Sequence, residues 1–182
     1  MIKNKDELAY FIKCDQNARP AYTKGKINRI LMKDFDMYIF KYLKVLRKQE
    51  FYLNQKRTIK NKIMYYYYTR KKNNIGMKLQ FNIPPNVFGE GLILSHHGTL
   101  IINAGAKVGK NCVLHGNNCI GNNGKDQRAP IIGDNVDIGV NSSIIGDIYL
   151  ADGIIVGANS VVTKSFYEKN IVIAGIPAKK IR

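Results

Sequence analysis

Cysteines are few in this 182-residue chain and follow no pattern. Cys14, Cys112 and Cys119 form no CxxC pair, so their spacing indicates neither a zinc site nor a redox motif. No run of about 18 apolar residues is present to span a bilayer. The first residues also lack the basic start, apolar run and small-residue cleavage site of a signal peptide. We therefore expect a cytoplasmic protein whose cysteines are structural.

Acidic residues are scarce in the N-terminal part of the chain. Residues 1–80 contain 20 Lys and Arg against 6 Asp and Glu, whereas the remainder contains 9 against 7. From Lys26 to Tyr68 there is neither glycine nor proline, and apolar residues recur at helical intervals. The recurring positions are Ile27, Leu31, Phe35, Tyr38, Tyr42 and Leu46. The pattern predicts a basic α-helical segment over residues 1–80, with a break at Asn73, Asn74 and Gly76.

The cationic helical surface has three interpretations that the sequence leaves open. It is a solvated outer face, or it contacts an anionic membrane surface or acidic polymer, or it binds nucleic acid. Nucleic acid is disfavoured because no helix-turn-helix, zinc or RNA-binding signature accompanies the charge. The tyrosines at 65–68 point all round a helix and are expected to pack rather than to stack on bases.

A six-residue repeat occupies the second half of the chain. Eleven positions six residues apart are aliphatic, except for Asp126: Ile102, Val108, Leu114, Ile120, Asp126, Ile132, Ile138, Ile144, Leu150, Val156 and Val162. Glycines follow five of them, and neither a helical nor a two-residue period produces this pattern. A parallel β-helix does, because each short strand points one aliphatic side chain inward and turns at a permissive residue. We therefore predict a mainly β fold, with a β-helix over residues 81–182, a loop near 122–129 and a C-terminal tail over 166–182.

Three repeats make one coil, so the period also predicts which side chains stack. Asn122, Val140 and Ala158 are expected to form a column of small side chains along one corner. Such a column leaves backbone amides open to a long, thin ligand, although small residues also suit tight corners. His97 and His115 are expected to stack on neighbouring coils, with His96 pointing the opposite way.

Polar residues gather at two places in the repeat. All three histidines, His96, His97 and His115, fall in or beside it, and histidine is the usual general base near neutral pH. Residues 122–129 interrupt the aliphatic pattern, and Asp126 and Arg128 are placed there to meet an anionic or hydroxylated substrate. A merely solvated loop is the other interpretation.

Several motifs resemble those of a known family. They are GLILSHHGTLIIN (91–103), IGNNGK (120–125), IGDNVDIGVNSSIIGDI (132–148), VGANSVVTKS (156–165) and AGIPAKKI (174–181). Together they resemble the left-handed β-helix domain of the serine acetyltransferase group of hexapeptide acyltransferases. The resemblance implies a left-handed helix, a homotrimer with active sites between subunits, and acetyl-CoA as co-substrate.

The resemblance also implies roles for individual residues. His96 aligns with the catalytic general base. At the acceptor site, Arg128 matches the family, while Ser95 replaces an aspartate and Ala129 a histidine; His97, His115 and Asp126 are further candidates there. Asn122, Val140 and Ala158 match positions along the CoA groove. Lys164, Lys179 and Lys180 lie where the family places the CoA nucleotide.

The short basic leader and the end of the chain after AGIPAKKI resemble O-acetyltransferases of capsule or other surface polysaccharides more than the serine enzymes of cysteine synthesis. We therefore expect acetyl transfer to a sugar hydroxyl, in the cytoplasm or at the inner face of the membrane. Serine O-acetylation is the alternative, and a non-catalytic trimeric scaffold is a further one. The histidine spacing argues against the three-histidine zinc site of a γ-type carbonic anhydrase, so no metal is expected.

Overall fold

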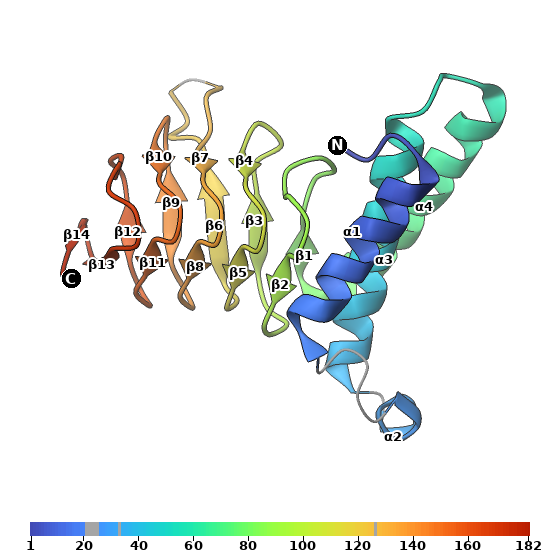
Figure 1. Ribbon diagram of the computed structural model, residues 1–182, viewed down its shortest axis with the longest axis horizontal. Helices are drawn as coiled ribbons and strands as arrows, with labels where there is room; N and C mark the ends of the chain where they lie inside the picture. Colours follow the sequence, from blue (N-terminus) through green and yellow to red (C-terminus); the bar gives the residue numbers. More distant parts are fainter. Residues whose placement is uncertain (21–25, 33, 126) are drawn as a thin grey trace.

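The computed structural model describes residues 1–20, 26–32, 34–125 and 127–182. Within these residues four helices precede fourteen short strands (Figure 1). The helices are α1 (Lys5–Ala18), α2 (Lys26–Leu31), α3 (Phe35–Leu53) and α4 (Ile59–Leu79). The strands are β1 (Phe81–Asn82), β2 (Ile93–Leu94), β3 (Leu100–Ile102), β4 (Lys107–Val108), β5 (Val113–Leu114), β6 (Asn118–Gly121), β7 (Ile131–Ile132), β8 (Asp137–Ile138), β9 (Ser143–Ile145), β10 (Tyr149–Leu150), β11 (Ile155–Val156), β12 (Val161–Val162), β13 (Val172–Gly175) and β14 (Ala178–Lys180).

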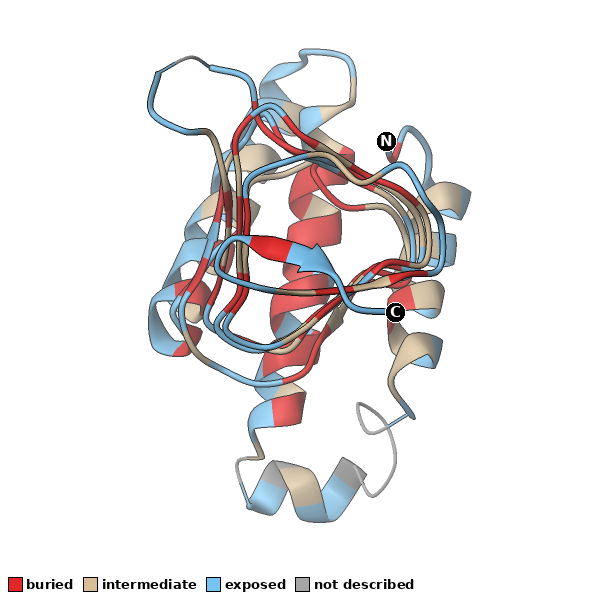
Figure 2. Cartoon of the chain, turned by 90° about the vertical axis from the view of Figure 1, so that its left-hand side faces the viewer, coloured by how far each residue is buried: buried red, intermediate tan, exposed pale blue. Residues whose placement is uncertain are grey.

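The strands form the three faces of a parallel β-helix, which Figure 2 shows along its axis. Sheet A has the order β1-β3-β6-β9-β12, sheet B β4-β7-β10 and sheet C β2-β5-β8-β11-β13-β14. All pairings are parallel except that of β13 with β14. Both strands lie in the segment predicted as a C-terminal tail, and they extend sheet C. The predicted mainly β architecture is confirmed.

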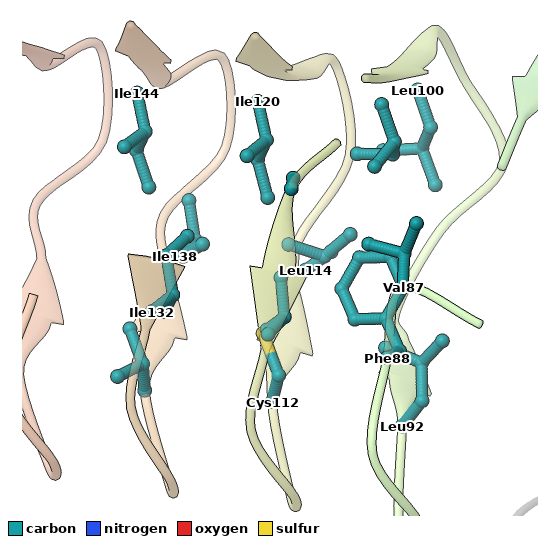
Figure 3. Close-up of a cluster of buried hydrophobic side chains, with 14 of the residues drawn as sticks. Val87, Phe88, Leu92, Leu100, Cys112, Leu114, Ile120, Ile132, Ile138 and Ile144 are labelled. Carbon is teal, nitrogen blue, oxygen red and sulfur yellow. The ribbon is translucent and has the colours of Figure 1, made fainter. Parts of the chain in front are cut away.

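The interior of the β-helix is a stack of aliphatic side chains from the predicted inward positions, of which Figure 3 labels Leu114, Ile120, Ile132, Ile138 and Ile144. Asp126, the one polar member of the series, lies outside the described residues. Ile120, Ile138 and Ile144 are fully buried, and every other aliphatic member of the series is at most 5% exposed. The six-residue period therefore identified the core correctly. Burying one such side chain contributes about 1.5–3 kcal/mol, so the stack is the main source of stability for the coils.

The corners use asparagine and glycine for different reasons. Asparagines supply the left-handed backbone conformation: Asn111, Asn117, Asn135, Asn141 and Asn159 have φ between 53° and 60°. The glycines that follow the core positions serve close approach between coils instead. A Cβ at Gly139 would lie 2.6 Å from the backbone nitrogen of Ala158 in the next coil. The prediction that these glycines are the permissive corner residues was therefore incomplete.

One coil is longer than the others by a whole repeat. Ile102 pairs with Ile120, three repeats further along the chain, but Ile120 pairs with Ile144, which is four repeats further. The extra repeat lies in the loop between β6 and β7, residues 122–130. Because the insertion equals one repeat, the aliphatic phase continues through it, and the sequence pattern does not reveal the change of corner.

The helices cover the open end of the β-helix, at the opposite end from the C-terminus (Figure 1). α3 buries Ile39, Tyr42, Leu43 and Leu46 against the first coil. The predicted apolar series does not hold at its start, since Ile27 is 76% exposed and belongs to the separate helix α2. No helix in the described ranges combines the length and apolar character of a membrane-spanning segment.

The predicted break near Gly76 was wrong. α4 runs unbroken to Leu79 and ends at Gln80, which adopts the left-handed conformation. Gly76 is buried, and a Cβ there would lie 2.6 Å from the carbonyl oxygen of Phe81. This glycine lets α4 pack closely on the start of the β-helix rather than ending the helix.

A buried arginine of α3 binds backbone groups at the edge of the first coil, where no further coil pairs with them. Arg47 donates to the carbonyl oxygens of Phe88 and Gly89, at 3.0 and 2.6 Å. Its other N–H groups bind both carboxylate oxygens of Asp15 and one of Glu50, at 2.8–3.1 Å. All five guanidinium donors are thereby satisfied.

Three further side chains bind backbone groups of the same edge. Asp15 accepts from the N–H groups of Gly91 and Leu92, Glu50 from that of Asn86, and Lys72 donates to the carbonyl of Ile83. Burial alone lowers the pKa of Arg47, but Glu50 and Asp15 outweigh it and raise that pKa, so the guanidinium stays charged. Two cations and two carboxylates thus satisfy an edge that would otherwise bury unpaired polar groups.

Replacing Arg47 by Met leaves Asp15 and Glu50 buried without their cation. We expect the free energy of unfolding to fall by about 3–5 kcal/mol, measured by urea denaturation followed by circular dichroism. Lys41→Met, at an exposed position of the same helix, is the control. If the two variants are equally stable, Arg47 does not hold the helices to the first coil.

Candidate active site

The corner between sheets C and A carries the histidines, and we call it the histidine corner. In successive coils it comprises residues 95–99, 115–117, 139–142 and 157–160. His96 and His97 are exposed in the first of these turns. A Cβ on Gly116 would lie 3.8 Å from the Cβ of His96, so His96 lies over the turn of the next coil.

The predicted stacking of His97 on His115 was wrong. β2 pairs with β5 so that Leu94 lies beside Leu114. The separation of these partners along the chain is two residues more than the length of three repeats. The first turn is longer than the second by the same amount, and Ser95 is therefore the residue beside His115. Ser95 is buried, and its N–H donates to the carbonyl of Leu114.

His96 and His97 do not point in opposite directions, contrary to the prediction. Both lie against Phe35, the first residue of α3, with ring centroids 6.2 and 5.8 Å away. Strand alternation does not apply to them because β2 ends at Leu94. Phe35 is the contribution of the helical segment to this corner, and the sequence offered no signal for it beyond its place in the apolar series.

His115 has a carboxylate partner. Its Nε2 lies 2.9 Å from Oδ1 of Asp137 on β8, and both side chains are 40% exposed. An ionised carboxylate only accepts hydrogen bonds, so Nε2 carries the proton and Nδ1 of the neutral ring is left as an acceptor. Asp137 was not predicted. The strand register that brings it to His115 depends on the inserted repeat, since Val113 pairs with Asp137, four repeats further along the chain rather than three.

The predicted column of Asn122, Val140 and Ala158 was wrong in its first member. The N–H of Asn159 binds the carbonyl of Val140, which stacks these two turns. The N–H of Asn141 binds the carbonyl of Gly116 in the same way, whereas Asn122 lies at the corner between sheets A and B. The small-residue column is therefore Gly116, Val140 and Ala158, and it begins beside His96.

The loop that contains Arg128 begins at the end of sheet A that lies away from the histidine corner. Four residues of β6 separate it from the histidine corner, which corresponds to about 15 Å along the strand. Arg128 forms an ion pair with Asp147, while Asp126 lies outside the described residues. Within one chain the structure does not bring Arg128 to His96.

The three predicted CoA-nucleotide lysines all lie in the last coil but at different places. Lys164 follows β12 of sheet A, and its Nζ lies 5.3 Å from the ring centroid of Phe166. Lys179 and Lys180 lie in β14, and Lys180 pairs with Glu168 at 2.6 Å. Over the part of the chain that the structure describes, no three His, Cys, Asp or Glu side chains are grouped to hold a metal ion.

Solved serine acetyltransferases resemble the chain over nearly its whole length. The enzyme from Brucella abortus strain S19 is 24% identical, with a TM-score of 0.74, and 97% of this chain and 70% of that chain are covered. The Neisseria gonorrhoeae enzyme is 25% identical, with a TM-score of 0.72 and coverage of 98% and 67%. The chain has the fold of the serine acetyltransferases.

With that fold the β-helix is left-handed, as expected. The coverage includes the helical segment, so its four helices are part of the similarity and do not set the chain apart. No family model and no curated protein sequence matches the chain.

The contact between His115 and Asp137 predicts the tautomer of His115. Nitrogen NMR of the neutral ring should place the proton almost wholly on Nε2, and Asp137→Ala should raise the share of the Nδ1–H tautomer. Asp147→Ala, which removes a carboxylate at another corner, is the control and should leave the signals unchanged. An unchanged tautomer in Asp137→Ala would contradict the pairing.

Proposed function

We propose that this protein is an acetyl-CoA-dependent O-acetyltransferase. The observation that carries the proposal is the histidine corner, where the exposed His96 lies at one end of the column Gly116, Val140 and Ala158. Small side chains there leave the backbone open to a long, thin molecule such as the pantetheine arm of CoA. A solved serine acetyltransferase in complex with coenzyme A, 25% identical with a TM-score of 0.70, supports the same assignment.

In this proposal His96 acts as the general base. It takes the proton of the acceptor hydroxyl while the hydroxyl oxygen bonds to the thioester carbonyl carbon. Backbone N–H groups of the corner stabilise the negative charge that develops on the carbonyl oxygen. The carbon–sulfur bond then breaks, and the leaving thiolate takes the proton from the imidazolium of His96.

The acceptor favoured by the comparisons is serine. The similarity extends through the helical segment, whose shortness had favoured a sugar acceptor, and solved relatives include complexes with serine and with cysteine. A sugar hydroxyl of a surface polysaccharide stays the second candidate, because Ser95 and Ala129 replace the aspartate and histidine that the resemblance places at the serine site.

The distance between the two predicted halves of the site supports a role for subunit assembly. Arg128 and His96 lie at opposite ends of sheet A, so an active site that uses both takes the loop from a second copy. This supports the proposed homotrimer, with each site between two subunits. His97 lies in the same turn as His96, and His115 lies at the same corner in the next coil.

His96→Ala should lose about 10²–10⁴-fold in kcat while the protein keeps its fold and assembly. The measurement is thiol release from acetyl-CoA in the presence of serine and, separately, of polysaccharide from the source cell. Lys107→Ala, at an exposed position of sheet B outside the histidine corner, is the control and should retain most of its activity. Wild-type turnover by His96→Ala would remove the histidine from the mechanism, and turnover of polysaccharide but not serine would reverse the order of acceptors.

The small-residue column gives a second test. Ala158→Trp fills the column and should raise the KM for acetyl-CoA by about tenfold or more, with a smaller effect on the KM for the acceptor. Lys110→Trp makes a similar change at an exposed residue of another corner and should leave both constants near their original values. Equal effects of the two variants would place CoA elsewhere.

A further inference from the structure

The outer face of α4 is apolar, exposed and covered by no other element among the described residues. We define it as Ile59, Ile63, Tyr66 and Tyr67, which are 82%, 61%, 58% and 51% exposed. Their spacing of four, three and one residues places them along one side of the helix. Exposing isoleucine side chains to water is unfavourable in free energy, so the face indicates a binding site for a partner with apolar groups.

The opposite side of α4 is already used. Tyr68 stacks on Tyr52 of α3 at 5.5 Å, and Thr69 accepts a hydrogen bond from Gln49. Lys72 reaches the edge of the first coil. These contacts fix the rotation of the helix and direct the α4 outer face away from the rest of the chain.

Positive charge surrounds this face. Residues 51–89 contain eight Lys and Arg and neither Asp nor Glu. Within α4, Lys60, Lys62 and Arg70 are exposed beside the apolar residues. A second copy packed on the same face would bring these cations together, so their charge favours an anionic partner.

A cleft of about 470 Å³ adjoins the face at the tip of the α3–α4 hairpin. Its lining combines cations and aromatic rings: Lys56, Arg57, Lys62, Tyr52, Tyr65 and Tyr66. Lys and Arg attract phosphate groups, and tyrosine suits the boundary between water and hydrocarbon because its ring is apolar and its hydroxyl polar.

We propose that the α4 outer face and this cleft bind the surface of an anionic lipid bilayer. Ile59 and Ile63 enter the boundary between headgroups and acyl chains, and the surrounding cations contact anionic headgroups. An acidic polysaccharide would satisfy the cations but offers no hydrocarbon for the isoleucines. Since the helices occupy one end of the β-helix, the coils extend from the attached end and keep their corners open (Figure 1).

The test is flotation of the full chain with vesicles. Vesicles of phosphatidylcholine with about one third phosphatidylglycerol should carry the protein at low salt, and vesicles of phosphatidylcholine alone should not. Lys60→Gln with Lys62→Gln should weaken binding about fivefold for each cation removed. Ile59→Ser with Ile63→Ser should weaken it about tenfold or more, and because both residues are exposed the thermal unfolding midpoint should not change.

Matched controls lie on the β-helix. Lys107→Gln with Lys110→Gln, and Ile181→Ser, replace exposed residues of the same types and should bind like the original chain. Failure to float with anionic vesicles would overturn the proposal. Equal binding by the isoleucine variant would also overturn it, as would a change of oligomeric state in that variant, which would assign the face to a second copy. Capture by an acidic polysaccharide but not by vesicles would assign the charge to a polymer.

Discussion

The structure depends on closing the exposed edge of its first coil. A β-helix ends in unpaired backbone groups and an open core, and both need a partner. Here α3 covers the core with Tyr42 and Leu46, while Arg47, with Asp15 and Glu50, binds the free carbonyl and N–H groups. The helical segment and the coils are therefore one folding unit, and the charges of the junction are buried because they compensate one another.

The same closure brings the helices to the candidate active site. Phe35 begins α3 and lies against both His96 and His97, so the position of His96, the proposed general base, depends on how α3 packs on the first coil. The similarity to solved serine acetyltransferases covers the helices as well as the repeat. α4 has two different faces, since one side packs on α3 and the outer face is exposed.

Much of the fold was predictable because it depends on local rules. The inward aliphatic positions, the helical character of residues before Phe81 and the exposed histidines follow from periodicity and composition. The contacts between His115 and Asp137 and between Gly116 and His96 do not, because turns of unequal length separate the residues. The asparagines with positive φ at 117, 141 and 159 carried the missing signal. The step from 117 to 141 is longer than the step from 141 to 159 by one repeat, and this difference marks the insertion.

The sequence by itself determined which side chains enter the core, since that depends only on position within a six-residue repeat. Only the tertiary structure decided which corner each residue occupies, since that depends on position within a whole coil. An insertion of one repeat leaves the position of each residue within its repeat unchanged, but it moves the position within the coil by one corner. It separated Asn122 from Val140 and Ala158 and set Asp137 beside His115.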